Sequence, residues 1–263
     1  MRPPRTDATS RIPVPGTYNF REPGGYPATD GFIRRGKLFR SDGLHSLGEA
    51  GRSALGALGV RLVIDLRDDF EASAQPDALD GLDLEVIRLP VFEGRGSSEG
   101  GSSLGLAALY ERVVTQHTAV VVTALRQIAA SGESAVLVHC TAGKDRTGIV
   151  VALALSAVGV DRALVVADYA RSEENLNGEW LEGMLALIAR YGVEETPELR
   201  ILLGGSPPEV LEGVLDLIDE RHGSVRQYLL AGGLGLSELA TLERVLVDRA
   251  VTSQALWDGQ AFL

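Results

Sequence analysis

Two apolar stretches on either side of a short polar loop constrain the fold of this chain more than any other feature. Residues 135–138, Ala-Val-Leu-Val, are a continuous apolar run typical of a strand covered on both faces. Residues 149–155 have no polar face, which indicates a buried helix, and Gly159 is a plausible stop. We therefore expect a strand, a tight loop and a buried helix in succession. Such a loop lies at the carboxyl end of its strand, where ligands bind in open α/β sheets.

The rest of the chain predicts a larger α/β domain around this unit. Clustered or alternating apolar residues indicate strands, and apolar residues at a helical period indicate helices. Strands are expected over 33–41, 60–66 and 84–89, and helices over 43–58, 106–131 with a break near 117–118, 180–191, 208–221, 224–230 and 237–251. We predict a central, mostly parallel sheet flanked by helices, with a helical C-terminal half, in a single domain over residues 1–263. Residues 1–16 would be an N-terminal extension, and the Gly/Ser-rich residues 93–103 a flexible loop.

Composition limits the class of protein and its partners. Hydrophobic residues make up 45% of the 263 residues, enough for a large core, and no stretch approaches the roughly 18 to 20 apolar residues of a membrane helix. The N-terminal residues form no apolar signal-peptide core, so cytoplasmic residence is the default expectation, with secretion by a signal-independent route left open. A net charge of -11 disfavours non-specific binding of nucleic acid. An anionic substrate would therefore need a local basic site.

The single cysteine, Cys140, follows the predicted central strand directly. One cysteine cannot form an internal disulfide or a multi-cysteine zinc site, so Cys140 is either a buried apolar filler or a reactive thiol. Its neighbours favour a reactive thiol. Arg146 lies six positions later with Gly143 in between, and this spacing lets the backbone curl so that successive amides face inward around an anion. The following helix adds the positive end of its dipole at the same place.

These residue types fit the hydrolysis of a phosphate monoester through a phosphocysteine intermediate. A helix N-terminus beside an arginine lowers the pKa of a thiol, so the thiolate of Cys140 would attack the phosphorus. Arg146 suits bidentate contact with two phosphoryl oxygens, and the hydroxyl of Thr147 would donate a hydrogen bond to the sulfur. The expected phosphate-binding residues are Thr141, Ala142, Gly143, Lys144, Asp145 and Arg146. No metal and no cofactor are expected.

The decapeptide HCTAGKDRTG at residues 139–148 resembles the signature of bacterial protein tyrosine phosphatases, in the family typified by the secreted mycobacterial phosphatase B. Further segments resemble motifs of that family, namely 19–22 with 24–25, 38–41, 63–67, 167–172, and 223–224 with 228–229. The resemblance covers roughly residues 17–247. It implies the fold of tyrosine phosphatases, a phosphotyrosine-containing protein as substrate, and a helical lid over the site within residues 173–208.

Three residues keep alternative roles. Asp145 is either the general acid that protonates the leaving group or a residue that only shapes the loop. The resemblance places Asp65, at the end of its strand, close by as a partner or an alternate acid. Lys144 resembles the lysine with which phosphoinositide phosphatases contact an additional phosphate; as the alternative, it is a solvated lysine that raises the local potential.

Three arginines recur in the N-terminal motifs that resemble the family. Arg21, Arg40 and Arg67 would either line an acidic-substrate site or pair with carboxylates inside the protein. We expect two of the three to be paired.

The sequence thus predicts metal-independent hydrolysis of phosphate monoesters, with phosphotyrosine as the substrate. A phosphoinositide or dual-specificity phosphatase is the alternative. A rhodanese-like sulfurtransferase also uses a loop cysteine, but its loop does not resemble residues 143–147. A non-catalytic phospho-binding module would keep Arg146 and usually lose Cys140.

Overall fold

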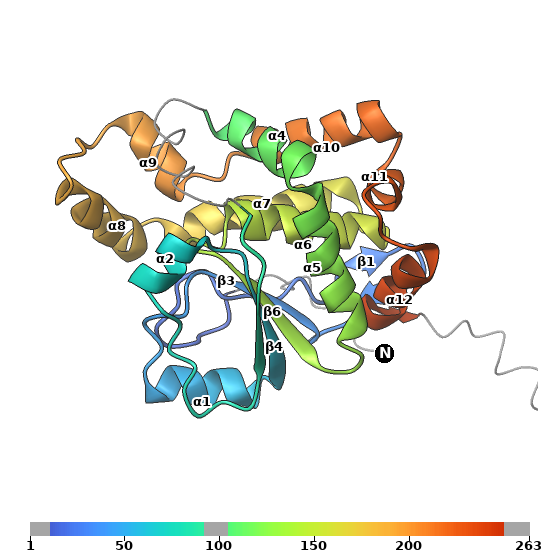
Figure 1. Ribbon diagram of the computed structural model, residues 1–263, viewed down its shortest axis with the longest axis horizontal. Helices are drawn as coiled ribbons and strands as arrows, with labels where there is room; N and C mark the ends of the chain where they lie inside the picture. Colours follow the sequence, from blue (N-terminus) through green and yellow to red (C-terminus); the bar gives the residue numbers. More distant parts are fainter. Residues whose placement is uncertain (1–10, 92–104, 250–263) are drawn as a thin grey trace, which may run out of the picture.

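A four-stranded parallel sheet lies at the centre of the protein (Figure 1). The computed structural model describes residues 11–91 and 105–249. The strand order is β3-β6-β4-β5, and every neighbouring pair is parallel. The strands are β3 (Leu38–Ser41), β6 (Ala135–His139), β4 (Val60–Asp65) and β5 (Glu85–Arg88). The α/β fold expected from the sequence, a parallel sheet flanked by helices, is confirmed.

The central strand β6 is buried on both faces, as its continuous apolar run predicts. All five of its residues are buried. Leu137 packs on one face in a core that includes Leu55 of α1, whereas Val136 and Val138 belong to the larger core on the other face. Successive side chains of a strand point to opposite faces, so a strand between two cores needs apolar residues at every position.

Helices cover the two faces unequally. The helices are α1 (Glu49–Ala57), α2 (Asp69–Ala74), α4 (Leu106–Gln116), α5 (Thr118–Ala130), α6 (Asp145–Ala157), α7 (Arg162–Leu176), α8 (Glu179–Ala189), α9 (Pro197–Gly204), α10 (Pro208–His222), α11 (Val225–Ala231) and α12 (Leu236–Leu246). Among the helices of the described residues, only α1 contributes to the smaller core, and α4, α5, α6, α7, α10, α11 and α12 contribute to the larger one. The predicted break between two helices falls at His117. Over residues 11–91 and 105–249, no helix combines the length and the apolar character needed to cross a membrane.

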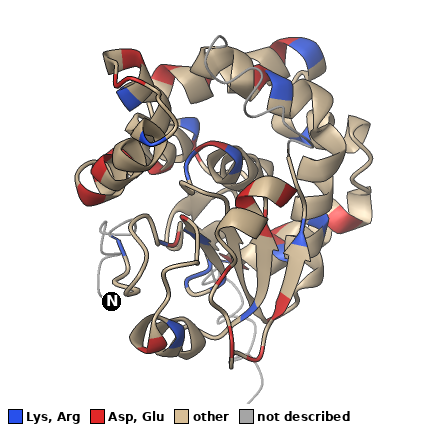
Figure 2. Cartoon of the chain, turned by 60° about the vertical axis from the view of Figure 1, so that its left-hand side comes forward, with Lys and Arg blue, Asp and Glu red and all other residues tan. Residues whose placement is uncertain are grey.

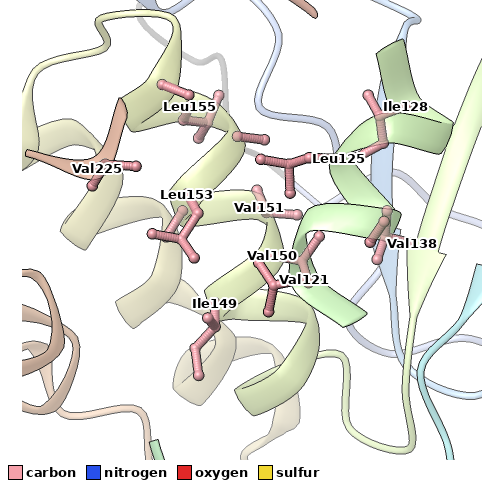
Figure 3. Close-up of a cluster of buried hydrophobic side chains, with 14 of the residues drawn as sticks. Val121, Leu125, Ile128, Val138, Ile149, Val150, Val151, Leu153, Leu155 and Val225 are labelled. Atoms are coloured by element: carbon pink, nitrogen blue, oxygen red, sulfur yellow. The ribbon is translucent and has the colours of Figure 1, made fainter. Parts of the chain in front are cut away.

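Helix α6 is the centre of the larger core (Figure 3). Every residue from Ile149 to Leu155 is buried, which confirms the helix without a polar face. Val121, Leu125 and Ile128 of α5 lie beside it in the same cluster. The helix that follows Cys140 is therefore anchored by burial on all sides.

Residues 33–41 do not form one strand, contrary to the prediction. Ile33 ends β2 (Gly31–Ile33), and Leu38 begins β3 of the central sheet. Between them Gly36 has a φ of 68°, a conformation that glycine adopts at little cost, and the chain turns there from one sheet to the other.

The last predicted helix, over 237–251, is also shorter than expected. Helix α12 ends at Leu246, and β7 (Val247–Arg249) pairs antiparallel with β2. Together with β1 (Pro27–Ala28) these strands form a small antiparallel sheet in the order β1-β2-β7.

Some sequence predictions fall on residues for which no structure is described. The predicted flexible loop 93–103 lies outside the described residues, as do residues 1–10 of the predicted extension. Within 173–208 the chain forms the end of α7 and the helices α8 and α9. The predicted lid segment is helical, and its closure over a site stays a prediction.

Candidate active site

The loop between β6 and α6 turns sharply around its single glycine. Cys140 follows the last residue of β6 and is 1% exposed, and α6 begins at Asp145. Gly143 has a φ of 65°, and a Cβ atom there would lie 2.2 Å from the carbonyl oxygen of Ser41. Both the backbone conformation and the close approach of β3 require glycine at this position.

The carbonyl groups of the loop are drawn to its outer side. Asn19 Nδ2 donates to the carbonyl oxygens of Ala142 at 2.9 Å and Gly143 at 3.2 Å. Arg40 Nη2 donates to the oxygen of Gly143 at 2.8 Å, and the amide of Gly43 donates to that of Thr141 at 3.0 Å. In a trans peptide the next N–H points opposite to the carbonyl, so three successive amides face away from these donors and toward the inside of the loop.

A buried charged cluster holds the outer side of the loop. Arg40 Nη1 lies 2.6 Å from Asp168 Oδ2, and Arg21 Nη2 donates to Asp168 O and Ser172 Oγ, both at 2.9 Å. Burial, and next the neighbouring guanidinium of Arg40, lower the pKa of Arg21 to about 9. Arg67 binds the carboxylates of Asp65 and Asp77. All three arginines of the N-terminal motifs are therefore paired with carboxylates. The expectation that one of them is unpaired is wrong.

Arg146 is held by a carboxylate that sequence reasoning did not identify. Its Nη1 and Nη2 lie 2.5 Å and 2.7 Å from the two oxygens of Glu71 on α2, and Thr141 Oγ1 donates to the same carboxylate at 2.6 Å. End-on pairing uses one N–H of each terminal nitrogen, and Nη1 also lies 3.5 Å from the carbonyl oxygen of Leu66. Nε–H and the second N–H of Nη2 are then left for a second anion.

These contacts shift the pKa of both partners. Burial alone would raise the pKa of Glu71, but the hydrogen bonds and charge of Arg146, with the hydroxyl of Thr141, lower it to about 2. Burial would lower the pKa of Arg146, but Glu71, Cys140 and Asp145 raise it above its ordinary value. The pair therefore stays ionised at neutral pH.

Asp145 in the first turn of α6 is bound by a tyrosine from α4. Tyr110 Oη donates to Asp145 Oδ1 at 2.6 Å and lies 2.9 Å from the hydroxyl of Tyr169, whose ring is edge-on to it. Burial and the nearby carboxylate of Asp145 raise the pKa of Tyr110 well above its ordinary value, so its hydroxyl stays protonated and donates. The side chain of Asp145 is 22% exposed, which leaves it accessible at the mouth of the loop.

Asp65 lies beside the loop but is bound to other groups. Arg67 donates to both of its oxygens at 2.9 Å, and Arg67 Nη2 also lies 2.8 Å from Asp77. His139 Nε2 is 3.3 Å from Asp77, and the three ligand atoms of Asp65, Asp77 and His139 lie within 4.8 Å of one another. Such a set resembles a metal site, but the guanidinium of Arg67 already supplies the cation. Asp65 is therefore held by Arg67 and is 2% exposed, whereas the side chain of Asp145 is 22% exposed.

Two further predicted residues are placed differently from the expectation. The hydroxyl of Thr147 is buried and has no hydrogen-bond partner in the described part of the chain, so the expected bond to the sulfur is not formed. Lys144 is neither solvated nor at the mouth of the loop: it is fully buried, and its Nζ donates to the carbonyl oxygens of Leu202 and Gly205. The interpretation of Lys144 as a solvated lysine is wrong.

Basic residues near the loop have acidic partners among the described residues, such as Glu71 beside Arg146. Figure 2 shows acidic and basic residues interspersed along the chain in that view. A dianionic ligand would therefore be bound by the loop itself, through its inward amides, the N-terminus of α6 and Arg146.

Several known proteins are similar to this chain. Residues 12–248 match a family described as a tyrosine phosphatase family. The chain is 32% identical over 274 aligned residues to the triple specificity protein phosphatase PtpB of Mycobacterium tuberculosis, an alignment that covers 89% of this chain and 98% of the relative. It is 38% identical over 155 residues to a tyrosine-protein phosphatase of Nostoc commune, covering 57% of this chain and 51% of the relative. Among solved structures, TpbA of P. aeruginosa matches with a TM-score of 0.38 and 19% identity over 70% of this chain and 99% of that chain.

Proposed function

The chain belongs to the tyrosine phosphatase family, and from this premise we propose that Cys140 is the nucleophile, Arg146 the phosphate-binding cation and Asp145 the general acid of a phosphotyrosine phosphatase. The observation that carries the proposal is the loop geometry. Asn19 and Arg40 bind carbonyl oxygens of the loop that follows Cys140, which turns the next amides away from these donors, and Glu71 holds the guanidinium of Arg146.

In the first step the thiolate of Cys140 attacks phosphorus in line with the bond to the phenolic oxygen. The P–S bond forms as the P–O bond breaks, and the departing phenolate takes the proton of Asp145. The charge that develops on the three equatorial oxygens is stabilised by the inward amides, the N-terminus of α6 and the free edge of Arg146.

In the second step water attacks the phosphocysteine. Asp145, now ionised, accepts a proton from the water, the P–S bond breaks, and inorganic phosphate leaves. The buried hydroxyl of Thr147 has no hydrogen-bond partner among the described residues. We infer that a rotation about its side-chain bond lets it donate to the departing sulfur. The thiolate is then restored without any metal ion.

Substrate class is supported by the relatives' names. The two relatives described above are named as phosphatases, one for tyrosine and one for triple specificity. Phosphotyrosine in a protein is therefore the proposed substrate, and hydrolysis of phosphoserine, phosphothreonine or phosphoinositides is the second candidate. Initial rates on matched phosphopeptides and on phosphoinositides would rank them.

The test is the substitution Cys140→Ser. It should abolish turnover of phosphotyrosine peptides, while binding of vanadate and the thermal midpoint stay close to those of the parent. The matched measurement on the parent in EDTA should show no loss of activity. Appreciable turnover by Cys140→Ser would overturn the mechanism, and activity lost in EDTA and restored by a divalent ion would overturn its metal independence.

A further inference from the structure

Lys144 belongs to the catalytic loop, yet its side chain ends on another element. It is fully buried, and its Nζ donates to the carbonyl oxygens of Leu202 and Gly205, each at 2.8 Å. The third neighbour is Asp145 Oδ1 at 3.4 Å. An ammonium group carries three N–H bonds, and these oxygens offer an acceptor for each. Two of the three N–H bonds are used by the carbonyl oxygens at the end of α9, and the carboxylate of Asp145 lies within ion-pair distance of the ammonium group.

The two carbonyl groups mark the C-terminus of α9. The last carbonyls of a helix have no partner within the helix, and a cation there is favoured by the helix dipole. The oxygen of Ile201 accepts from the amide of Gly205, and that of Leu202 accepts from Lys144. A residue of the catalytic loop thus caps a helix in the segment predicted to be a lid.

The same end of α9 is fastened to α7 on its other side. Ser206 and Glu173 exchange hydrogen bonds, from Ser206 N to Glu173 Oε2 at 3.0 Å and from Glu173 N to Ser206 Oγ at 2.8 Å. Ser206 Oγ also donates to Ala170 O at 3.0 Å. By contrast, Tyr191 between α8 and α9 is 78% exposed. The α8–α9 segment is therefore held at its inner end, next to the catalytic loop.

We propose that Lys144 is a positioning residue that fastens α9 to the catalytic loop and acts on the reaction through α9, without contact with the substrate. This deepens the proposed function and rests on it for its consequence in catalysis. The contact between Lys144 and the C-terminus of α9 would keep α9 in the same position next to Asp145, whichever substrate is bound. A second phosphate on the substrate would gain nothing from Lys144.

The first arm of the test measures amide hydrogen exchange in Lys144→Met. Loss of the ammonium should speed exchange over residues 199–206 at least about tenfold, because the end of α9 loses its cap. Lys37→Met is the matched control, since Lys37 is also buried and donates to the carbonyl of Gly132 at 2.8 Å, at the opposite end of β3. It should leave exchange over 199–206 within about twofold of the parent. Ser206→Ala, which leaves the loop intact, should speed exchange there as well.

The second arm measures dissociation constants by calorimetry for inorganic phosphate and for an inositol bisphosphate. In Lys144→Met both should change by the same factor, within about twofold. A loss of at least tenfold confined to the bisphosphate, or unchanged exchange over 199–206, would overturn the proposal. Neither arm requires turnover. A parent protein without phosphatase activity would refute the proposed function, whereas the contact between Lys144 and α9 would still be tested by hydrogen exchange and ligand binding.

Discussion

The first turn of α6 and the remaining turns of this helix are both largely buried, but their surroundings differ. From Ile149 to Leu155 the neighbours are apolar side chains of the larger core. In the first turn, Asp145 and Arg146 instead meet Tyr110 and Glu71 through short hydrogen bonds. Apolar contacts are non-directional and stabilise the fold, whereas charged hydrogen bonds fix the direction of a side chain. Substitutions in the two regions should therefore affect different measurements.

The largest effect on activity within this comparison is expected for Arg146→Lys. A point charge cannot bind Glu71 end-on and two phosphoryl oxygens at the same time, so kcat/KM should fall by about 10³ to 10⁵. Steady-state kinetics and a thermal melt together check this. A variant with near-parent activity would show that the planar fork is not required.

The next effect is expected for Asp145→Asn, and it should depend on the leaving group. Phenyl phosphate and phosphotyrosine need protonation, so their phosphoenzyme formation should slow by about 10² to 10⁴, with a much smaller loss on highly acidic phenols. Rapid-quench measurement of the phosphoenzyme is needed, because steady-state rates can report its hydrolysis instead. Uniform loss across all leaving groups would mean that Asp145 only shapes the loop. Tyr110→Phe, which removes the hydroxyl that holds Asp145, should give a smaller loss with the same leaving-group trend.

Glu71→Gln should lower activity less than Arg146→Lys or Asp145→Asn, because Glu71 acts through Arg146. Without the carboxylate the fork of Arg146 loses its orientation, and kcat/KM should fall by roughly 10²-fold, the scale of a small misplacement of a catalytic group. A double-mutant cycle with Arg146→Lys separates the roles. Glu71→Gln should have little further effect once Arg146 is replaced, and full additivity would contradict the assignment.

The Glu71–Arg146 pair should also make stability depend on pH in the acid range. The pKa of Glu71 falls from 4.5 to about 2 on folding, so the folded state binds fewer protons than the unfolded state between these values. Stability from the ionised carboxylate is complete above about pH 4.5 and is lost as the pH falls toward 2, by at most about 3 kcal/mol. Urea unfolding of parent and Glu71→Gln at pH 5 and pH 3 tests the sign. The difference between them should shrink at pH 3, and a constant difference would refute it.

The smallest effect on activity is expected in the apolar turns. Leu153→Ala removes a side chain that is 1% exposed and should lower the free energy of unfolding by about 2 to 5 kcal/mol, while kcat/KM of the folded protein changes less than about twofold. Leu236→Ala is the matched control, since Leu236 is 74% exposed, and should cost less than about 0.5 kcal/mol. A tenfold loss of kcat/KM in folded Leu153→Ala would show that the two regions are not separable.

The sequence predicts the β6–loop–α6 unit well because its signals are local. The apolar run, Gly143 and the helix without a polar face all lie within one short stretch. Local patterns also predict the break at His117. Local patterns predict a single strand over residues 33–41, because two apolar strands of different sheets follow each other closely in the sequence. Gly36 between these strands is a turn signal.

Glu71 could not be identified from apolar periodicity. Helix α2 contains no buried residue, so it leaves no apolar period in the sequence. Its one local signal is the capping box, in which Asp68 accepts from the amide of Glu71 and the amide of Asp68 donates back to Glu71. That pattern predicts a helix start, but the contact with Arg146 depends on tertiary structure. The same holds for Asp168, which binds arginines more than a hundred residues away in the chain.

The contacts on the outer side of the catalytic loop also constrain when the site can form during synthesis. Asn19 binds Ala142, 123 residues later, and Arg21 binds Ser172, 151 residues later. When a growing chain has left the ribosome only as far as the end of α6, every residue of the loop is available. The part of α7 that binds Arg21 and Arg40 is still missing. Contacts of such long sequence separation form late, so the loop should be among the last elements to acquire its final shape. Until then Cys140 is present in the nascent chain, but the loop around it cannot yet bind phosphate.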